Sequence, residues 1–249
     1  MKHRDYFYTE PTNISEGILE IKGQELKHLS RVLRKKVRDI IEVVDGQGNL
    51  YTAILTKINK ETAQAEIQKK ARYIAEPNFK LTLAHAIPKR KRFDLVIEKG
   101  TEIGVSIFIP LLCKNSNVNE VSSRLNRWKK IAIAAMKQSA RSVLPEITAP
   151  QTIQDILRNQ GLLKLGLIAD MGKNAKSLST IISELKQKSA PIKSATMLIG
   201  PEGGFSQNEI KLAIENGFHR FSLGPRRLRT ETAGIAASAI LMELVGEMG

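Results

Sequence analysis

The chain has 249 residues, 42% of them hydrophobic, so it can form one large domain or two ordinary ones. No apolar stretch reaches about 18 residues and the start of the chain is charged, so we expect a cytoplasmic protein without a membrane segment. A single cysteine excludes a disulfide framework, and together with four scattered histidines it predicts no metal site. The net charge of +14 favours a polyanionic partner such as nucleic acid over a basic surface that binds nothing.

Residues 1–73 are predicted to form a compact β-barrel domain. Short apolar runs typical of strands are DYFY, GILEI, DIIEVVD, LYTAILTKI and TAQAEI. Between the third and fourth of these runs, the glycine-containing stretch DGQGN (45–49) is typical of the turn of a β-hairpin.

One basic helix is predicted inside this first domain, over residues 23–39, with leucines 26, 29 and 33 at helical spacing. The basic residues around them include Arg31, Arg34, Lys35 and Lys36, which we predict to bind RNA. The alternative for such a charged run is a solvated helix face.

The pattern changes near residues 72–78, and residues 74–249 are predicted to form a second domain. Five apolar runs, beginning near residues 79, 106, 162, 195 and 218, alternate with five helical stretches at 91–104, 122–141, 177–188, 206–216 and 231–247. This alternation predicts an α/β domain with a parallel sheet covered by helices. Ligands of such sheets bind at the carboxyl ends of the strands.

The first notable loop, LIGPEGGFSQNEI (198–210), contains three glycines and ends in a capping box of Ser206 and Glu209. Because Gly200, Gly203 and Gly204 have no Cβ, backbone groups there can lie directly against a ligand. The alternative is an ordinary turn whose glycines adopt positive φ.

Other nucleotide and hydrolase signatures do not occur. There is no G-x-G-x-x-G motif, no complete P-loop and no G-x-S-x-G nucleophile elbow. Cys113 lies in an apolar run and is interpreted as a packed thiol.

The second notable loop, LGPRRLRTETAG (223–234), also follows a predicted strand and precedes a helix. Thr230 is a candidate N-cap, and Glu231 would then stand in the first turn, where the helix dipole favours a negative charge. The following helix is rich in Gly, Ala and Ser, which suits either a buried core helix or a subunit interface.

Together these motifs resemble the RsmE family, the small-subunit ribosomal RNA methyltransferases of the SPOUT superfamily that methylate N3 of a uridine in 16S rRNA. The resemblance runs nearly end to end. It is carried by HLSRVLRKKVRD, VVDGQGNLYTA, KRFDLVIEKGTEIGVSIFIPL, KQSARSVLPEI, LIGPEGGFSQNEI and LGPRRLRTETAGIAA. Within KQSARS, Ala140 stands where glycine is more usual.

The resemblance implies a PUA-like barrel followed by a SPOUT methyltransferase domain with a C-terminal trefoil knot, a homodimer, and bound S-adenosylmethionine as cofactor. It implies these cofactor-binding residues: Ala169, Met171, Leu198, Ile199, Gly200, Pro201, Glu202, Gly203, Leu223, Gly224 and Leu228. The implied partner is 16S rRNA within the small ribosomal subunit.

Uridine N3 carries a proton, so its methylation requires either a base or a cation that stabilises the anion. Arg229 is our candidate anion stabiliser and Glu231 our candidate base; the alternative is an ion pair that only fixes the loop. Arg4 and Arg141 are candidates for holding phosphate or base. Two further functions stay open from the sequence: a SPOUT methyltransferase with another RNA target, and an RNA-binding module without catalysis.

Overall fold

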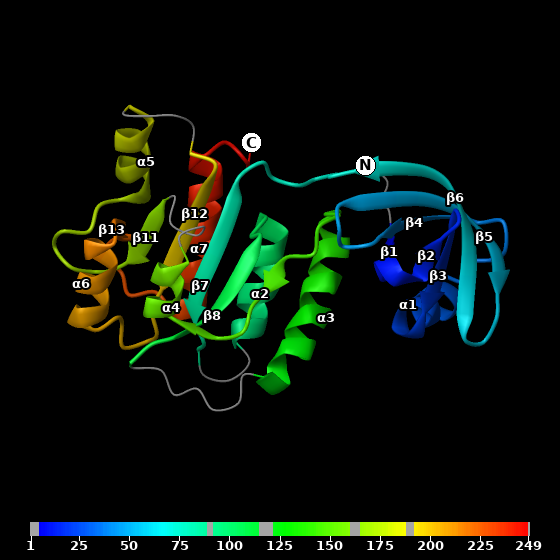
Figure 1. Ribbon diagram of the computed structural model, residues 1–249, viewed down its shortest axis with the longest axis horizontal. Helices are drawn as coiled ribbons and strands as arrows, with labels where there is room; N and C mark the ends of the chain where they lie inside the picture. The colour runs from blue at the N-terminus through cyan, green and yellow to red at the C-terminus, as the bar shows by residue number, and fades with distance from the viewer. Residues whose placement is uncertain (1–4, 89–91, 115–121, 160–164, 188–191, 249) are drawn as a thin grey trace. The chain divides into compact units, whose positions relative to one another are not determined.

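The computed structural model describes residues 5–88, 92–114, 122–159, 165–187 and 192–248 (Figure 1). The chain divides into two compact units, Met1–Glu76 with Ala132–Leu144, and Pro77–Ile131 with Pro145–Gly249. These units assign the segment 132–144 to the first unit, and the domains expected from the sequence, 1–73 and 74–249, stay a prediction.

The first unit is built on a six-stranded sheet, ordered β1-β4-β5-β6-β3-β2. Its strands are β1 (Tyr6–Tyr8), β2 (Ile14–Ser15), β3 (Ile18–Lys22), β4 (Ile40–Val44), β5 (Asn49–Ile58) and β6 (Thr62–Arg72). Strand β1 pairs with β4 in parallel, and every other neighbouring pair is antiparallel. The predicted hairpin at 45–49 is confirmed, because β4 and β5 pair across it and both Gly46 and Gly48 have positive φ.

Alternating side chains of this sheet enclose one core. Leu19 and Ile21 of β3 and Ile41 and Val43 of β4 are buried, whereas the residues between them are not. This period of two is what a strand with one buried face requires. Phe7, Tyr51 and residues of the helical segment complete the core.

The helical segment of the first unit is shorter than predicted. A short helix, η1 (Pro11–Asn13), precedes β2; between β3 and β4 the chain forms α1 (Gly23–Lys27), which continues as one π-helical stretch, η2 (His28–Val32). The expected helix 23–39 ends early because Arg34 adopts a left-handed φ of 51° and Arg38 N already donates to Leu55 O of β5 at 2.7 Å. The sheet therefore takes over the backbone hydrogen bonds that the last predicted turns would have made.

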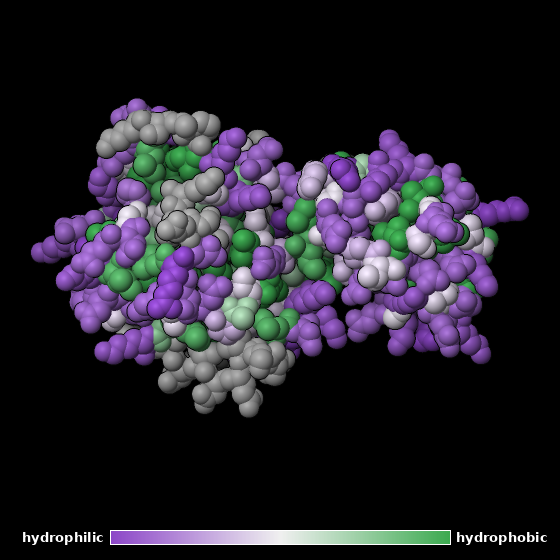
Figure 2. Space-filling view, viewed as in Figure 1, coloured by the Kyte–Doolittle hydropathy of each residue, from purple (hydrophilic) through white to green (hydrophobic). Residues whose placement is uncertain are grey.

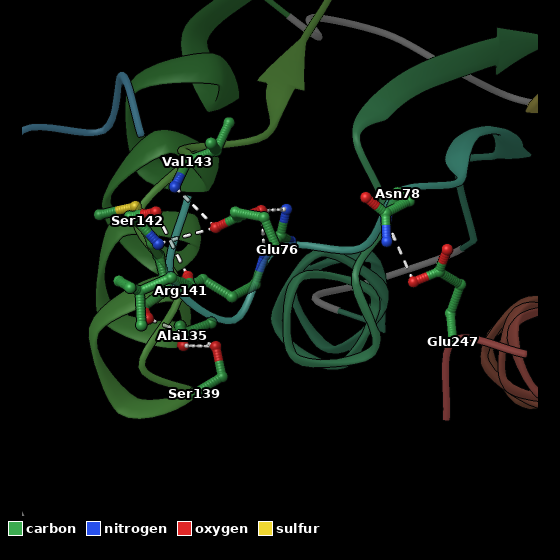
Figure 3. A network of polar contacts seen from close by, with 10 residues as sticks. Glu76, Asn78, Ala135, Ser139, Arg141, Ser142, Val143 and Glu247 are labelled. Carbon is green, nitrogen blue, oxygen red and sulfur yellow. Dashed lines mark hydrogen bonds and ion pairs between the residues drawn. The ribbon is translucent and has the colours of Figure 1, made fainter. Parts of the chain in front are cut away.

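A buried carboxylate holds the end of the first unit (Figure 3). Glu76 accepts from the Arg141 guanidinium at 2.9 and 3.1 Å and from the backbone amides of Ser142 and Val143 at 2.7 and 2.8 Å. These partners follow α3 (Ser122–Gln138). Ala140, in the same turn, has a left-handed φ of 60°, a conformation that glycine adopts without strain.

The second unit is built on a parallel sheet, ordered β10-β8-β7-β12-β11-β13, with β9 beside β8. Its strands are β7 (Lys80–Ala86), β8 (Ile107–Leu112), β9 (Glu146–Ile147), β10 (Gln151–Thr152), β11 (Gly166–Ala169), β12 (Ser194–Ile199) and β13 (Phe218–Phe221). Every pairing in it is parallel, so the predicted parallel sheet is confirmed.

Helices cover both faces of this sheet (Figure 1). They are α2 (Arg92–Ile103), α4 (Ile153–Arg158), α5 (Leu178–Lys186), α6 (Gln207–Glu215) and α7 (Thr230–Leu244). The part of α3 in this unit packs against α2, where the rings of Trp128 and Phe93 lie 4.6 Å apart between centroids. Helices α4 and α6 share a core cluster with Ala84 and Leu198, and α7 packs on β7, β12, α2 and α5. Helix α4 and the two-residue strands β9 and β10 were not predicted. Within the described ranges, no helix is long and apolar enough to cross a membrane.

Candidate active site

The two glycine-containing loops line one cavity of about 350 Å³ in the second unit. One loop joins β12 to α6 and the other joins β13 to α7; the segment after β11 is the third contributor. Because β11 lies between β12 and β13 in the sheet, the carboxyl ends of three adjacent parallel strands meet at this cavity. Its volume is in the range typical of small-molecule sites.

All predicted cofactor-binding residues except one line this cavity. The lining ones are Ala169, Met171, Ile199, Gly200, Pro201, Glu202, Gly203, Leu223, Gly224 and Leu228. The exception, Leu198, is completely buried in the core cluster between the sheet and α6. A side chain on the other face of β12 from Ile199 packs into that core because successive residues of a strand alternate.

The glycines of the two loops are present for different reasons. A Cβ on Gly200 would lie 3.1 to 3.2 Å from the ring and backbone of Phe205, so close packing within the loop favours glycine at this position. Gly204 and Gly224 have φ of 72° and 100° and open space where a Cβ would be, so their backbone conformation requires glycine. The alternative interpretation, positive φ, thus holds for Gly204, and Gly200 is explained by packing.

Asp170 and Arg220 form an ion pair at the edge of the cavity that the sequence did not indicate. Arg220 Nε donates to Asp170 Oδ2 at 2.7 Å, and Gly172 N donates to Oδ1 of the same carboxylate at 3.1 Å. A Cβ on Gly172 would collide with the Arg220 guanidinium, so a larger residue there would require this flexible side chain to shift. Asp170 lines the cavity, and its position just after an apolar strand was the available signal.

Two arginines of the second loop, Arg226 and Arg227, also line the cavity and were missed as site residues. Both are exposed, and both lie in the quoted stretch LGPRRLRTETAG. They give the cavity a cationic rim. Further lining residues outside the prediction are Gly204, Phe205, Gln207, Ile210, Phe221, Ser222, Thr230 and Ala233.

The helices that follow the loops begin differently. The predicted capping box of α6 is confirmed: Glu209 N donates to Ser206 Oγ at 3.3 Å and Ser206 N to Glu209 Oε2 at 2.7 Å. The predicted N-cap of α7 was wrong by one residue. Arg229 has the extended N-cap conformation and Thr230 is the first helical residue.

The two candidate catalytic residues of this loop, Arg229 and Glu231, lie in different environments. Arg229 is exposed, between the cavity-lining residues Leu228 and Thr230. Glu231 is 6% exposed and does not line the cavity; its Oε1 lies 3.6 Å from Nε of Arg92. Among the described residues, Oε2 of Glu231 has no hydrogen-bond partner.

Arg141, the remaining catalytic candidate that the structure describes, is not among the residues that line this cavity. Arg141 belongs to the first unit, where it is 3% exposed and paired with Glu76 (Figure 3). This environment gives Arg141 a structural role, and its part in holding phosphate or base stays a prediction. Arg4 lies outside the described residues.

The predicted RNA-binding residues lie at the surface of the first unit. Arg31, Arg34 and Lys36 are exposed and Lys35 is half-buried. They follow one another along η2 and the loop before β4, with the exposed apolar side chains Val32, Val37 and Ile40 nearby in sequence. Figure 2 shows that hydrophilic side chains cover most of this unit on the face in view.

Cys113 is buried, as the interpretation of a packed thiol requires. Burial, followed by the charge of Glu209, raises the pKa of the Cys113 thiol to about 12. A thiol with such a pKa is a poor nucleophile at neutral pH. No group of three or more His, Cys, Asp or Glu side chains suited to a metal ion occurs in the part of the chain described above.

Comparison with known proteins identifies two matching families. Residues 75–242 match the RNA methyltransferase domain family, and residues 21–68 match the RNA methyltransferase PUA domain family. A protein of Synechocystis named ribosomal RNA small subunit methyltransferase E is 35% identical over 239 residues, which cover 94% of this chain and 76% of that protein.

Solved structures of methyltransferases are also similar to this chain. The ribosomal RNA small subunit methyltransferase E of Neisseria gonorrhoeae, crystallised with S-adenosylmethionine, superposes with a TM-score of 0.85 at 31% identity, covering 99% of this chain and 100% of that one. A methyltransferase of Legionella pneumophila, also solved with this cofactor, gives a TM-score of 0.83 at 29% identity and covers 96% and 97% of the two chains. The expected fold class, a PUA-like domain followed by a SPOUT methyltransferase domain, is therefore confirmed, and the chain belongs to the ribosomal RNA small subunit methyltransferase E family.

Proposed function

We propose that this protein transfers a methyl group from S-adenosylmethionine to N3 of a uridine in 16S rRNA of the small ribosomal subunit. The observation that carries the proposal is a cavity lined by both glycine-containing loops, with Arg229 exposed beside it. Family membership supplies the reaction and the cofactor.

The lining of the cavity fits this cofactor. Ile199, Pro201, Leu223 and Leu228 offer apolar contacts for an adenine ring, and Gly203 and Gly204 have no Cβ, so their backbone can lie directly against it. When bound, S-adenosylmethionine supplies an electrophilic methyl group on a sulfonium. The exposed guanidinium groups of Arg226 and Arg227 suit the carboxylate of its amino-acid part.

Arg229 is our candidate for stabilising the uracil anion. An uncharged N3 is a poor nucleophile, and a guanidinium near O2 or O4 lowers the free energy of the deprotonated base. Arg229 is held at the N-terminus of α7 by its backbone, while its side chain is exposed. The structure describes no ion pair of Arg229 among residues 5–88, 92–114, 122–159, 165–187 and 192–248, so its charge is available to a substrate.

Glu231 is better suited to orienting this loop than to removing the proton. A base must come within hydrogen-bond reach of the proton that it takes. Glu231 is buried, does not line the cavity and faces Arg92. We therefore propose that it fixes the first turn of α7, and its role as the base stays a prediction that substitution can test.

The RNA is proposed to contact the exposed basic segment of the first unit. Arg31, Arg34, Lys35 and Lys36 offer charge for phosphates, which would add affinity without reading the reacting base. The target uridine should be unpaired, because a base in a loop reaches a cavity at lower cost than one in a duplex.

Three further properties are proposed with the function. The C-terminal segment forms a trefoil knot, the protein acts as a homodimer, and it works in the cytoplasm, where small subunits are assembled. Helix α7 supports the dimer, because Ile235, Ala236, Ala239 and Ile240 leave apolar surface partly or fully exposed. Light scattering in solution tests the dimer, for which we expect a mass of twice 27.7 kDa.

A methylation assay on small ribosomal subunits from a strain lacking this gene tests the proposal. Labelled S-adenosylmethionine should transfer its methyl group to 16S rRNA, and digestion followed by mass spectrometry should identify N3-methyluridine. Methyl transfer to another base, to a ribose or to transfer RNA would reassign the target. Cofactor binding without transfer to any RNA would leave an RNA-binding module.

A further inference from the structure

His85 connects the sheet to the helix that follows the second loop. It lies near the carboxyl end of β7, next to Ile199 in the register of β7 and β12, and it is completely buried. Its Nε2 lies 3.0 Å from the carbonyl oxygen of Thr230, and its Nδ1 lies 2.6 Å from that of Ala86. Each ring nitrogen thus faces one backbone acceptor, one in the strand and one in α7.

The surroundings hold this ring in one place. A Cβ on Gly234 of α7 would collide with Cδ2 and would lie 2.7 Å from Nε2, so the helix approaches the ring as closely as a glycine permits. On another side, Phe93 of α2 packs edge-on, with 5.8 Å between ring centroids. Because two helices and a strand restrict the movement of this ring, the ring can restrain the backbone carbonyls that it contacts.

The bond to Thr230 acts where the proposed catalytic loop becomes a helix. Thr230 is the first residue of α7 and lines the cavity, and Arg229 immediately precedes it. Within the helix, the amide of Ala233 donates to Arg229 O at 2.8 Å. A contact from outside the helix to Thr230 O therefore fixes the direction in which the chain leaves the loop, and with it the position of Arg229.

Burial lowers the pKa of the His85 imidazole, while both carbonyl contacts and the charges of Glu231 and Glu202 act in the opposite direction. A neutral ring carries one N–H and can donate to only one of the two carbonyls, whereas a protonated ring donates to both; in either case the bond to Thr230 requires a proton on Nε2. The contact of Nε2 with α7 can therefore be tested independently of the contact of Nδ1 with Ala86.

We propose that His85 is a positioning residue for methyl transfer: through Nε2 it holds the carbonyl of Thr230 and so fixes Arg229 beside the cavity. This inference rests on the proposed function, since it assumes that Arg229 meets the substrate. It adds a residue that none of the sequence motifs indicated.

Two matched variants test it. In His85→Gln, the side-chain amide nitrogen occupies roughly the place of Nε2 and can still donate to Thr230 O; in His85→Asn it occupies that of Nδ1 and cannot. We expect kcat of His85→Gln to stay within about threefold of wild type. For His85→Asn we expect a fall of tenfold or more with a much smaller change in KM for RNA, because a displacement of about 1 Å can cost about 100-fold.

Hydrogen exchange gives a readout that does not depend on activity. The Ala233 amide in the first turn of α7 should exchange faster in His85→Asn than in His85→Gln, without any cofactor. If the two variants agree in both kcat and exchange, the inference is wrong. If wild type transfers no methyl group to RNA, the proposed function fails, and the exchange result still decides whether His85 holds α7.

The wild-type protein offers a test that survives misfolding of either variant. Nitrogen-15 NMR of the labelled imidazole distinguishes a protonated from a bare ring nitrogen. We expect Nε2 of His85 to carry a proton at neutral pH. A bare Nε2 would overturn the proposed bond to Thr230.

Discussion

Arg141 and Glu76 form an ion pair whose side chains are only 4% and 8% exposed, and the same carboxylate also binds the backbone amides of Ser142 and Val143. Loss of the arginine would leave a buried carboxylate without its counter-charge. We predict that Arg141→Met lowers the free energy of unfolding of the first unit by about 3–5 kcal/mol.

Thermal or urea unfolding measures this loss, and Arg158→Met serves as the control. Arg158 pairs with Asp155 at 3.6 Å but its side chain is 81% exposed, so its replacement should hardly change stability. Unchanged stability of Arg141→Met together with weaker RNA binding would instead make Arg141 a substrate contact.

Ala140 offers a stabilising substitution. Its left-handed φ of 60° strains an alanine, and glycine removes the strain at some cost in chain entropy. Ala140→Gly should raise the free energy of unfolding by roughly 0.5–1 kcal/mol. In contrast, Ala134→Gly, at an exposed position within α3, should lower it by about 1 kcal/mol. A loss of stability in both variants would contradict the assigned backbone conformation.

Gly204 should be required for cofactor binding beyond its effect on folding. Gly204 and Gly217 both have positive φ and open space where a Cβ would be, but only Gly204 lines the cavity. Valine at either position should therefore cost similar stability. By calorimetric titration, Gly204→Val should weaken S-adenosylmethionine binding tenfold or more, equivalent to about 1.4 kcal/mol, and Gly217→Val should leave affinity nearly unchanged. Equal affinities in the two variants would separate Gly204 from the cofactor.

Glu231→Gln distinguishes an orienting carboxylate from a base. As an orienting group paired with Arg92, its loss should lower kcat by less than about tenfold and leave the shape of the pH–rate profile unchanged. Arg92→Gln should have a similar small effect. A fall of about 100-fold or more, with loss of the acidic limb of the profile, would establish Glu231 as the base.

Local sequence signals predicted those parts of the site that depend on neighbouring residues. The capping box of Ser206 and Glu209 and the glycines around residue 200 were visible because their partners lie within a few residues. The order of strands and helices was equally accessible, since apolar runs of strand length alternate with amphipathic helices.

Contacts between distant segments were not accessible in this way. Arg220 pairs with Asp170 across two adjacent strands, 50 residues apart, and Arg141 meets Glu76 over 65 residues. His85 reaches Thr230 over 145 residues. Each side chain alone is an ordinary polar residue, and only the fold supplies its partner, so the sequence indicates neither the contact of Arg141 with Glu76 nor that of His85 with Thr230.

Hydrogen–deuterium exchange with and without S-adenosylmethionine tests the central claim most directly. The claim is that one cofactor molecule is held by both glycine-containing loops, beside Arg229. The account predicts that the cofactor slows exchange in residues 199–205 and in residues 222–228 together, and leaves the first unit unchanged. Protection of only one loop, or of neither, would contradict it.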